Sequence, residues 1–98
     1  MPSDQELHDI AEDWKRKGNE AFGKSDPESA VQAYSQGLVQ VERIVSTPLL
    51  LKAALLSNRA MCYLKQAKLQ DCIDDCSSAL IILDKENNTK LRAKLMYR

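Results

Sequence analysis

The sequence has little of what most enzymes and most β-proteins need. Its 98 residues include one histidine, three glycines and three prolines, and aromatic residues make up only 5% of the chain. No glycine-rich loop of the kind that holds phosphate groups is present, and no base lies at a recognisable spacing from a cysteine. Isolated β-branched residues such as Val39 and Ile44 follow a helical spacing rather than an alternation. We therefore expect neither an enzyme nor a strand.

Cysteine is scarce as well, and its spacing argues against a metal site. The three residues, Cys62, Cys72 and Cys76, are an odd number without a CxxC motif. Cys72 and Cys76 would share one face of a helix, but the single histidine, His8, lies far away in the sequence. We interpret the cysteines as small buried residues of a protein in a reducing compartment, and we expect no metal and no cofactor.

Long apolar runs are missing. The most apolar stretch, TPLLLKAALLSNRAMCYL, is interrupted by Lys52, Asn58 and Arg59 and is too short to span a membrane. The N-terminus lacks the basic region and apolar run that are typical of a secretory signal. Together with the cysteines, these absences predict a cytoplasmic protein without a membrane partner.

Charge of one sign is not in excess, because 14 basic residues balance 14 acidic ones. The two ends differ, however: the first stretch is acidic, and only bases follow Glu86. Binding of nucleic acid through this basic end is a weak alternative for a chain that is neutral overall. The length allows one small domain and no second core.

What the sequence does contain is a helical spacing of apolar residues along the whole chain. Apolar side chains recur at three- and four-residue steps in four stretches and begin a fifth. GKSDPES separates the first two stretches, with Asp26 as a helix N-cap and Pro27 at the first helical position. STP, with Ser46 or Thr47 as the cap, precedes the third, and DKENN precedes the last. The pattern predicts an all-α fold of about five helices with antiparallel neighbours.

The chain also repeats itself when Ala11 is aligned with Ala53, an offset of 42 residues. In this alignment large residues face large or medium ones and small residues face small ones, with Tyr34 against Cys76 as the exception. The aligned pairs are Trp14 and Leu56, Gly18 and Ala60, Ala30 and Cys72, Tyr34 and Cys76, and Gly37 and Ala79.

These pairs resemble the packing positions of the tetratricopeptide repeat. That family stacks antiparallel helix hairpins into a right-handed superhelix, so the resemblance implies two repeats plus the first helix of a third. The boundaries expected within a domain of residues 1–98 are about 5–46, 48–84 and 88–98. The repeat starts are 42 and 40 residues apart, against a family period of about 34. The excess predicts lengthened helices, as in large immunophilins and related co-chaperones.

Gly18 has a definite role under this resemblance. Glycine inside a helix costs about 1 kcal/mol relative to alanine. Where the two helices of a hairpin cross, only glycine or alanine lets their backbones approach closely. We therefore expect Gly18 to be a packing glycine, whose cost is offset by a tertiary contact.

Five polar residues lie beside the apolar stripes of the helices that would line the concave groove. They are Lys15, Asn19, Asn58, Lys94 and Arg98. Their types and relative positions resemble the two-carboxylate clamp of tetratricopeptide co-chaperones. In that family the groove binds the C-terminus of heat-shock protein 70 or heat-shock protein 90, which ends in Glu-Glu-Val-Asp. Lysine and arginine provide charge-assisted hydrogen bonds to carboxylates, and asparagine donates without adding charge.

The resemblance also implies a division of roles. Lys15, Asn19 and Asn58 would hold the terminal carboxylate and part of the last side chain of the peptide. Lys94 with Arg98 would reach the last side chain and the backbone just upstream. The valine of the peptide would lie in an apolar pocket, for which the candidates are Phe22 and Leu64.

Other interpretations remain open from the sequence. A repeat scaffold that binds an internal segment of another protein needs no clamp, and Lys15 lies in KRK, where a neighbouring base could replace it. Asp71, Asp74 and Asp75 are interpreted as a solvated helix face. The third repeat lacks its second helix and is expected to be truncated. This predicts a fragment of a longer protein, or self-association through the fifth helix.

Overall fold

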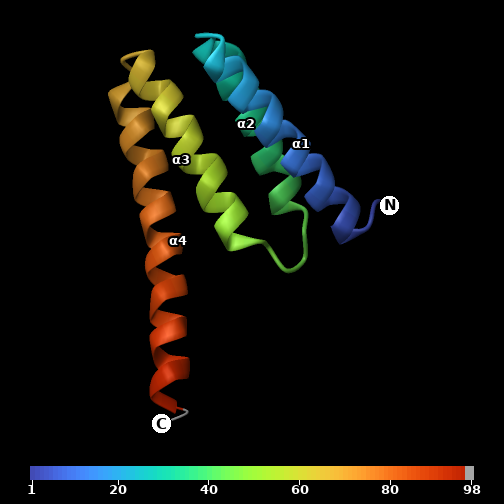
Figure 1. The fold of residues 1–98 in the computed structure, drawn as a ribbon, viewed down its shortest axis with the longest axis vertical. Coiled ribbons are helices and arrows are strands. Elements are labelled where there is room, and N and C mark those ends of the chain that lie inside the picture. Colours follow the sequence, from blue (N-terminus) through green and yellow to red (C-terminus); the bar gives the residue numbers. More distant parts are fainter. Residues whose placement is uncertain (97–98) are drawn as a thin grey trace.

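The computed structural model describes the backbone of residues 1–96 and the side chains of residues 1–87. Over this part of the chain it contains four helices and no strand. The helices are α1 (Asp4–Gly23), α2 (Pro27–Glu42), α3 (Leu49–Lys65) and α4 (Leu69–Met96). Figure 1 shows two antiparallel hairpins, α1 with α2 and α3 with α4, lying side by side. The all-α class and the hairpin arrangement are confirmed.

The expected fifth helix is not separate. A break was predicted at DKENN, but α4 continues without interruption for 28 residues to Met96. Residues 84–88 include neither glycine nor proline, and asparagine costs at most about 0.7 kcal/mol relative to alanine inside a helix. Nothing in the segment therefore stops the helix, and the prediction of five helices is wrong over the described backbone. The last turns of α4 extend beyond the other three helices (Figure 1).

The two hairpins turn in the same way, which supports the repeat offset of 42. Ser25 and Ala67 are 42 residues apart, and both have a left-handed backbone, with φ of 61° and 60°. A hydrogen bond that reaches back five residues closes each turn, as in a Schellman motif. The two bonds are Asp26 N to Ala21 O at 2.9 Å and Lys68 N to Tyr63 O at 2.8 Å.

The starts of α2 and α3 differ in how they are capped. The carboxylate of Asp26 accepts a hydrogen bond from Ser29 N at 3.1 Å, and Pro27 occupies the first turn, as predicted. Hydrogen bonding to Ser29, through its side chain and its backbone N–H, lowers the pKa of Asp26. Neither hydroxyl expected to cap α3 does so. Pro48 takes the cap position without a side-chain bond, and the Thr47 hydroxyl donates to a carbonyl of the preceding loop.

The core lies along α2, which is packed between α1 and α3. α1 packs extensively on α2, α2 on α3 and α3 on α4, whereas α1 and α3 touch at few points. Leu55 of α3 is fully buried, and a Cβ built on Gly37 would lie 3.0 Å from its Cδ2 atom. The other large buried side chains are Leu7, Tyr34, Leu38, Val41, Ile44, Leu51, Leu56, Cys62 and Ile82.

Gly18 packs against the ring of Tyr34. A Cβ built on Gly18 would lie 2.6 Å from Cδ1 of Tyr34, closer than real contacts of this type. Tyr34 is 2% exposed, so its ring has no free space into which it could move. The prediction of a packing glycine is confirmed, and the contact joins α1 to α2.

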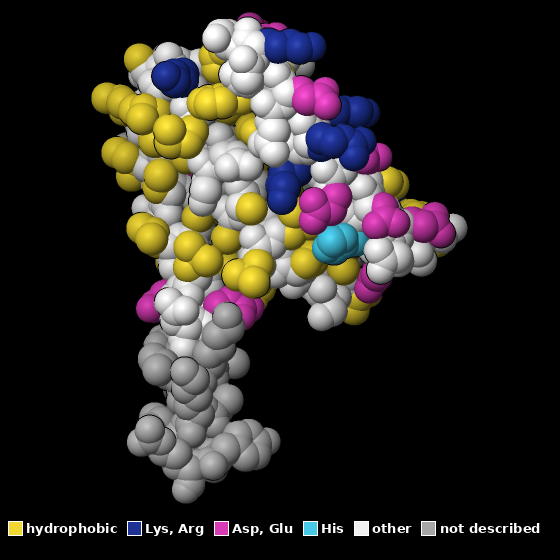
Figure 2. All heavy atoms as spheres, viewed as in Figure 1, with side chains coloured by type: hydrophobic (Ala, Val, Ile, Leu, Met, Phe, Trp, Pro, Cys, Tyr) yellow, Lys and Arg dark blue, Asp and Glu magenta, His cyan; other side chains and the backbone are white. Residues whose placement is uncertain are grey.

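Apolar side chains remain exposed along α4 and the end of α3, and Figure 2 shows them gathered over these two helices. They are Met61, Leu64, Leu69, Ile73, Leu80, Ile81 and Leu83. Cys76 is exposed on α4 as well, so the interpretation of all three cysteines as buried is wrong for Cys76 and correct for Cys62. Even so, a search of the described helices finds none with the length and apolar character needed to cross a membrane.

We predict that Gly18→Ala destabilises the fold. The substitution improves helix propensity by about 1 kcal/mol, but overpacking against Tyr34 costs about 1–3 kcal/mol. The expected net loss in the free energy of unfolding is about 1 kcal/mol, measured by urea denaturation. Gly23→Ala is the matched control, because nothing lies within 4 Å of its built Cβ. If both variants are equally stabilised, the close approach of α1 and α2 does not depend on Gly18.

Candidate functional site

Asn19 of α1 and Asn58 of α3 meet between the two hairpins. Asn58 Nδ2 donates a hydrogen bond to Asn19 Oδ1 at 3.4 Å, across 39 residues of sequence. Asn19 is exposed and Asn58 is partly buried, so the pair lies at the surface that α1 and α3 share. The structure therefore brings these two predicted site residues together.

The side-chain oxygen of Asn19 accepts a second hydrogen bond, from a residue of α2 in the core. The Tyr34 hydroxyl on α2 donates to Asn19 Oδ1 at 2.5 Å. Burial raises the pKa of Tyr34, so the hydroxyl stays protonated and remains a donor at neutral pH. The sequence predicted a packing role alone for Tyr34, and this contact was not predicted. A signal was available, because a tyrosine at a buried packing position brings a hydroxyl that needs a partner.

Lys15 lies one turn before Asn19 and has an acidic neighbour, Glu12, whose contact was not predicted from the sequence. Its Nζ is 3.6 Å from Glu12 Oε2, and both side chains are partly exposed. Lys15 and Glu12 line one side of a hollow of about 760 Å³. The rest of its lining comes from the loop before α3 and from the first turns of that helix, with His8 and Glu86 at its edges. Figure 2 shows this face of the molecule, with basic and acidic side chains intermingled over α1.

Of the last two predicted clamp residues, only the backbone of Lys94 is described, and it does not lie beside Asn19 and Asn58. The backbone of Lys94 lies in the last turns of α4, about 37 Å along the helix from Leu69 at 1.5 Å per residue. Those turns extend beyond the other three helices (Figure 1). The side chain of Lys94 and all of Arg98 lie outside the described residues, so their roles stay predictions.

The two candidates for the apolar pocket occupy equivalent positions, 42 residues apart. Phe22 is half-buried and lines a hollow of about 440 Å³ with Ser25, Pro27 and Lys65. Leu64 is about half exposed and does not line that hollow. Of the two, Phe22 lines this hollow, into which an apolar side chain could fit.

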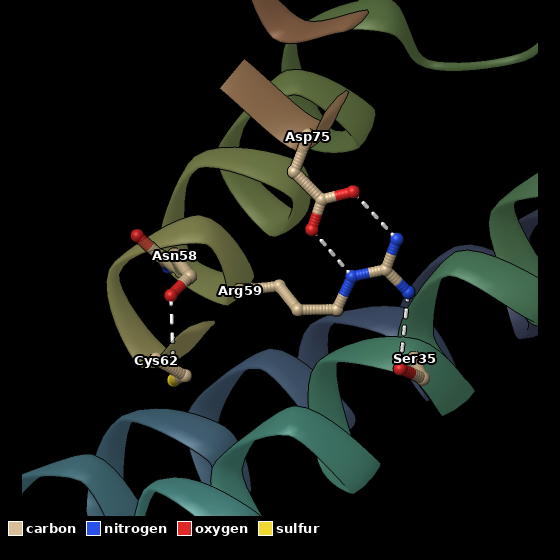
Figure 3. Close-up of polar contacts among 5 residues, drawn as sticks. All are labelled: Ser35, Asn58, Arg59, Cys62 and Asp75. Carbon is tan, nitrogen blue, oxygen red and sulfur yellow. Dashed lines mark hydrogen bonds and ion pairs between the residues drawn. The ribbon is translucent and has the colours of Figure 1, made fainter. Parts of the chain in front are cut away.

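Immediately after Asn58, a partly buried ion pair joins α3 to its neighbours (Figure 3). Arg59 forms two hydrogen bonds with the carboxylate of Asp75 on α4, from Nε at 2.7 Å and from Nη2 at 2.8 Å. The third branch of its guanidinium donates to Ser35 Oγ on α2 at 3.1 Å. The bonds with Asp75 raise the pKa of Arg59. Asp75 is 6% exposed, so its interpretation as part of a solvated face is wrong.

This ion pair bears on the site because consecutive residues of a helix point in different directions. Arg59 is directed to α2 and α4, which leaves Asn58 facing α1. The thiol of Cys62, one turn later, donates to the Asn58 carbonyl at 3.4 Å. The position of Asn58 is thus set by a residue with no part in the predicted clamp.

Comparison with known proteins finds relatives but no family assignment. No family model matches the chain, and no solved structure matches it. The chain is 34% identical to sperm-associated antigen 1 of Mus musculus over 98% of its length, and 36% identical to the Hsp70/Hsp90 co-chaperone CNS1 of Saccharomyces cerevisiae over 79%. It is also 33% identical to the mitochondrial import receptor subunit TOM34 of Homo sapiens over 91%.

The chain spans a small part of these relatives, namely 11%, 19% and 29% of their respective lengths. Its homologues thus include a co-chaperone of Hsp70 and Hsp90, and none of the three is named as an enzyme.

We predict that Asp75→Asn destabilises the protein by about 2 kcal/mol, because it leaves the partly buried Arg59 charge without its anionic partner. Denaturation by urea measures the loss. The matched control is Asp13→Asn, which breaks an exposed ion pair with Arg16 of the same 2.7 Å length. This control is expected to cost less than about 1 kcal/mol. Equal losses in the two variants would show that burial of the Arg59 pair adds nothing.

Proposed function

We propose that the chain is a non-catalytic adaptor module that binds the free C-terminus of heat-shock protein 90 or heat-shock protein 70. The observation that carries this proposal is the meeting of Asn19 and Asn58 between two hairpins, with Lys15 one turn away. The name of the yeast relative, an Hsp70/Hsp90 co-chaperone, supports the choice of partner. The tetratricopeptide repeat boundaries and the cytoplasmic location remain part of the proposal.

The chemistry of a chain end suits these side chains. A C-terminal aspartate offers two carboxylates, one from the backbone and one from the side chain. The Lys15 ammonium provides a charge-assisted hydrogen bond, about twice as strong as a neutral one. Asn19 and Asn58 donate through their amides and fix the direction of the carboxylate oxygens. A peptide segment without a free end has no backbone carboxylate to offer.

Glu12 competes with such a ligand for Lys15. In the free chain the Lys15 ammonium lies near the Glu12 carboxylate, and the ligand replaces this contact. An exposed ion pair of this kind stabilises by less than about 1 kcal/mol, so its loss takes little from the binding free energy. The same carboxylate repels an anionic peptide that lies close to it.

Lys94 and Arg98 complete the clamp only if α4 changes direction before it reaches them. We place this change at residues 84–88, because this segment contains two weak helix formers, Asn87 and Asn88. In the proposed bound state the helix ends there, and the basic end of the chain turns back toward Asn58.

We predict that a short peptide ending in Glu-Glu-Val-Asp binds with a free carboxylate and loses most of its affinity when amidated. Lys15→Ala weakens binding about tenfold or more, because a charged hydrogen bond contributes about 1.5–3 kcal/mol. Isothermal titration calorimetry measures both effects.

The matched control for this titration is Lys17→Ala. Lys17 lies in the same KRK stretch but stacks over the Trp14 ring at 4.5 Å. It is expected to leave the affinity unchanged. Equal affinity for the acid and the amide would replace the proposal with a scaffold that binds internal segments.

We also predict that Glu12→Gln raises the affinity for the same peptide about twofold to threefold. The variant removes the competing carboxylate, whose pair with Lys15 is worth a few tenths of a kcal/mol. Asp13→Asn is the control, because Asp13 pairs with Arg16 instead of Lys15. An unchanged or weaker affinity in Glu12→Gln would show that Lys15 is not held by Glu12 in solution.

A further inference from the structure

We propose that Tyr34 is a positioning residue of this site: its hydroxyl fixes the Asn19 side-chain amide so that Nδ2 is presented to the ligand carboxylate. The inference rests on the proposed function and adds a residue that lies in the core. It concerns which end of the Asn19 amide faces the ligand, because only the nitrogen end donates to an anion.

The hydrogen bond between Tyr34 and Asn19 has a definite direction. The hydroxyl hydrogen of a tyrosine that is 2% exposed needs an acceptor inside the protein. Asn19 Oδ1 lies at 2.5 Å, a separation typical of O–H···O bonds and shorter than the 2.7–3.2 Å usual for N–H···O bonds. The geometry therefore assigns Tyr34 as the donor and the Asn19 oxygen as the acceptor.

The contacts of the Asn19 oxygen also determine where its side-chain nitrogen points. Asn58 Nδ2 donates to the same oxygen, so Oδ1 accepts two hydrogen bonds. Among residues 1–87, whose side chains the structure describes, Asn19 Nδ2 donates to no protein acceptor. A flipped amide would leave the Tyr34 hydroxyl hydrogen without an acceptor and turn an oxygen toward the ligand carboxylate. The orientation that satisfies the core is therefore the one that can bind an anion.

The orientation of the Asn19 amide depends on how α1 and α2 pack in the first hairpin. The Tyr34 ring lies on Gly18, the residue before Asn19, which places the hydroxyl beside the Asn19 amide. The second hairpin offers an internal comparison at the offset of 42. There Cys76 stands in place of Tyr34 and Met61 in place of Asn19, so both the hydroxyl and the amide are absent. The tyrosine and the amide that it orients occur together in one hairpin and are both missing from the other.

The experiment is a double-mutant cycle on the full chain, with affinity for the Glu-Glu-Val-Asp peptide as the readout. Tyr34→Phe keeps the ring on Gly18 and removes only the hydroxyl. We expect it to weaken binding threefold to tenfold in the wild-type background and to have no effect in an Asn19→Ala background. A loss of the same size in both backgrounds would identify a merely structural role and overturn the inference, as would unchanged binding by Tyr34→Phe.

Two further measurements separate this inference from the proposed function. Tyr63→Phe, at the tyrosine beside Arg59, is the control for removing a hydroxyl elsewhere, and its affinity should equal that of the wild type. NMR of the Asn19 side-chain NH₂ group reports the orientation without a ligand. We expect no nuclear Overhauser contact between these protons and the ring at position 34 in the wild type, where the oxygen faces the ring, and clear contacts in Tyr34→Phe, where the amide is free to flip.

The NMR result distinguishes the two ideas. A wild-type chain that binds no peptide and lacks these Overhauser contacts overturns the proposed function and keeps the orientation of Asn19. Contacts that are the same in both proteins overturn the inference, whatever the peptide affinity.

Discussion

The distance between α1 and α3 depends on α2, because α1 and α3 barely touch each other. Two close approaches hold α2 in place: Tyr34 lies on Gly18 of α1, and Gly37 receives Leu55 of α3. A larger side chain at either glycine would move one wall of the groove away from the other. The Asn19–Asn58 contact at 3.4 Å therefore reports on core packing as much as on surface chemistry. The distance between Asn19 and Asn58 at the surface is therefore determined by how α2 packs in the core.

Much of the fold could be predicted from the sequence because the signals involved are local. A stripe of apolar residues, the Asp26 cap and the offset of 42 residues each depend on near neighbours or on self-comparison. The failures have a common origin in contacts between distant residues. Asp75 looked solvated because its partner Arg59 comes from another helix, and α4 was divided at DKENN although nothing in that segment stops a helix. Composition marks a possible boundary, and only the surrounding packing decides whether the chain uses it.

The candidate site was predictable in a similar, partial way. Lys15, Asn19 and Asn58 follow from helix positions and a family resemblance, and the structure places the two asparagines in contact. Neither Tyr34 nor Glu12 was expected beside them. Tyr34 reaches Asn19 from the core on another helix, α2, and Glu12 is one of several acidic residues in α1. Periodicity identifies which face a side chain occupies. It does not identify the hydrogen bonds that orient that side chain, which depend on distances of a few tenths of an ångström.

The unbroken α4 makes the proposed binding a matter of conformational equilibrium. A ligand that engages Lys94 together with Asn58 selects only molecules in which the helix ends near residue 86. Its apparent dissociation constant then equals the intrinsic constant divided by the fraction of molecules in that form. In the proposed bound state, residues 84–88 would therefore alter the affinity through their preference for helix or coil, although they do not touch the peptide. The affinity of the proposed site would in this way depend on the backbone thermodynamics of the chain.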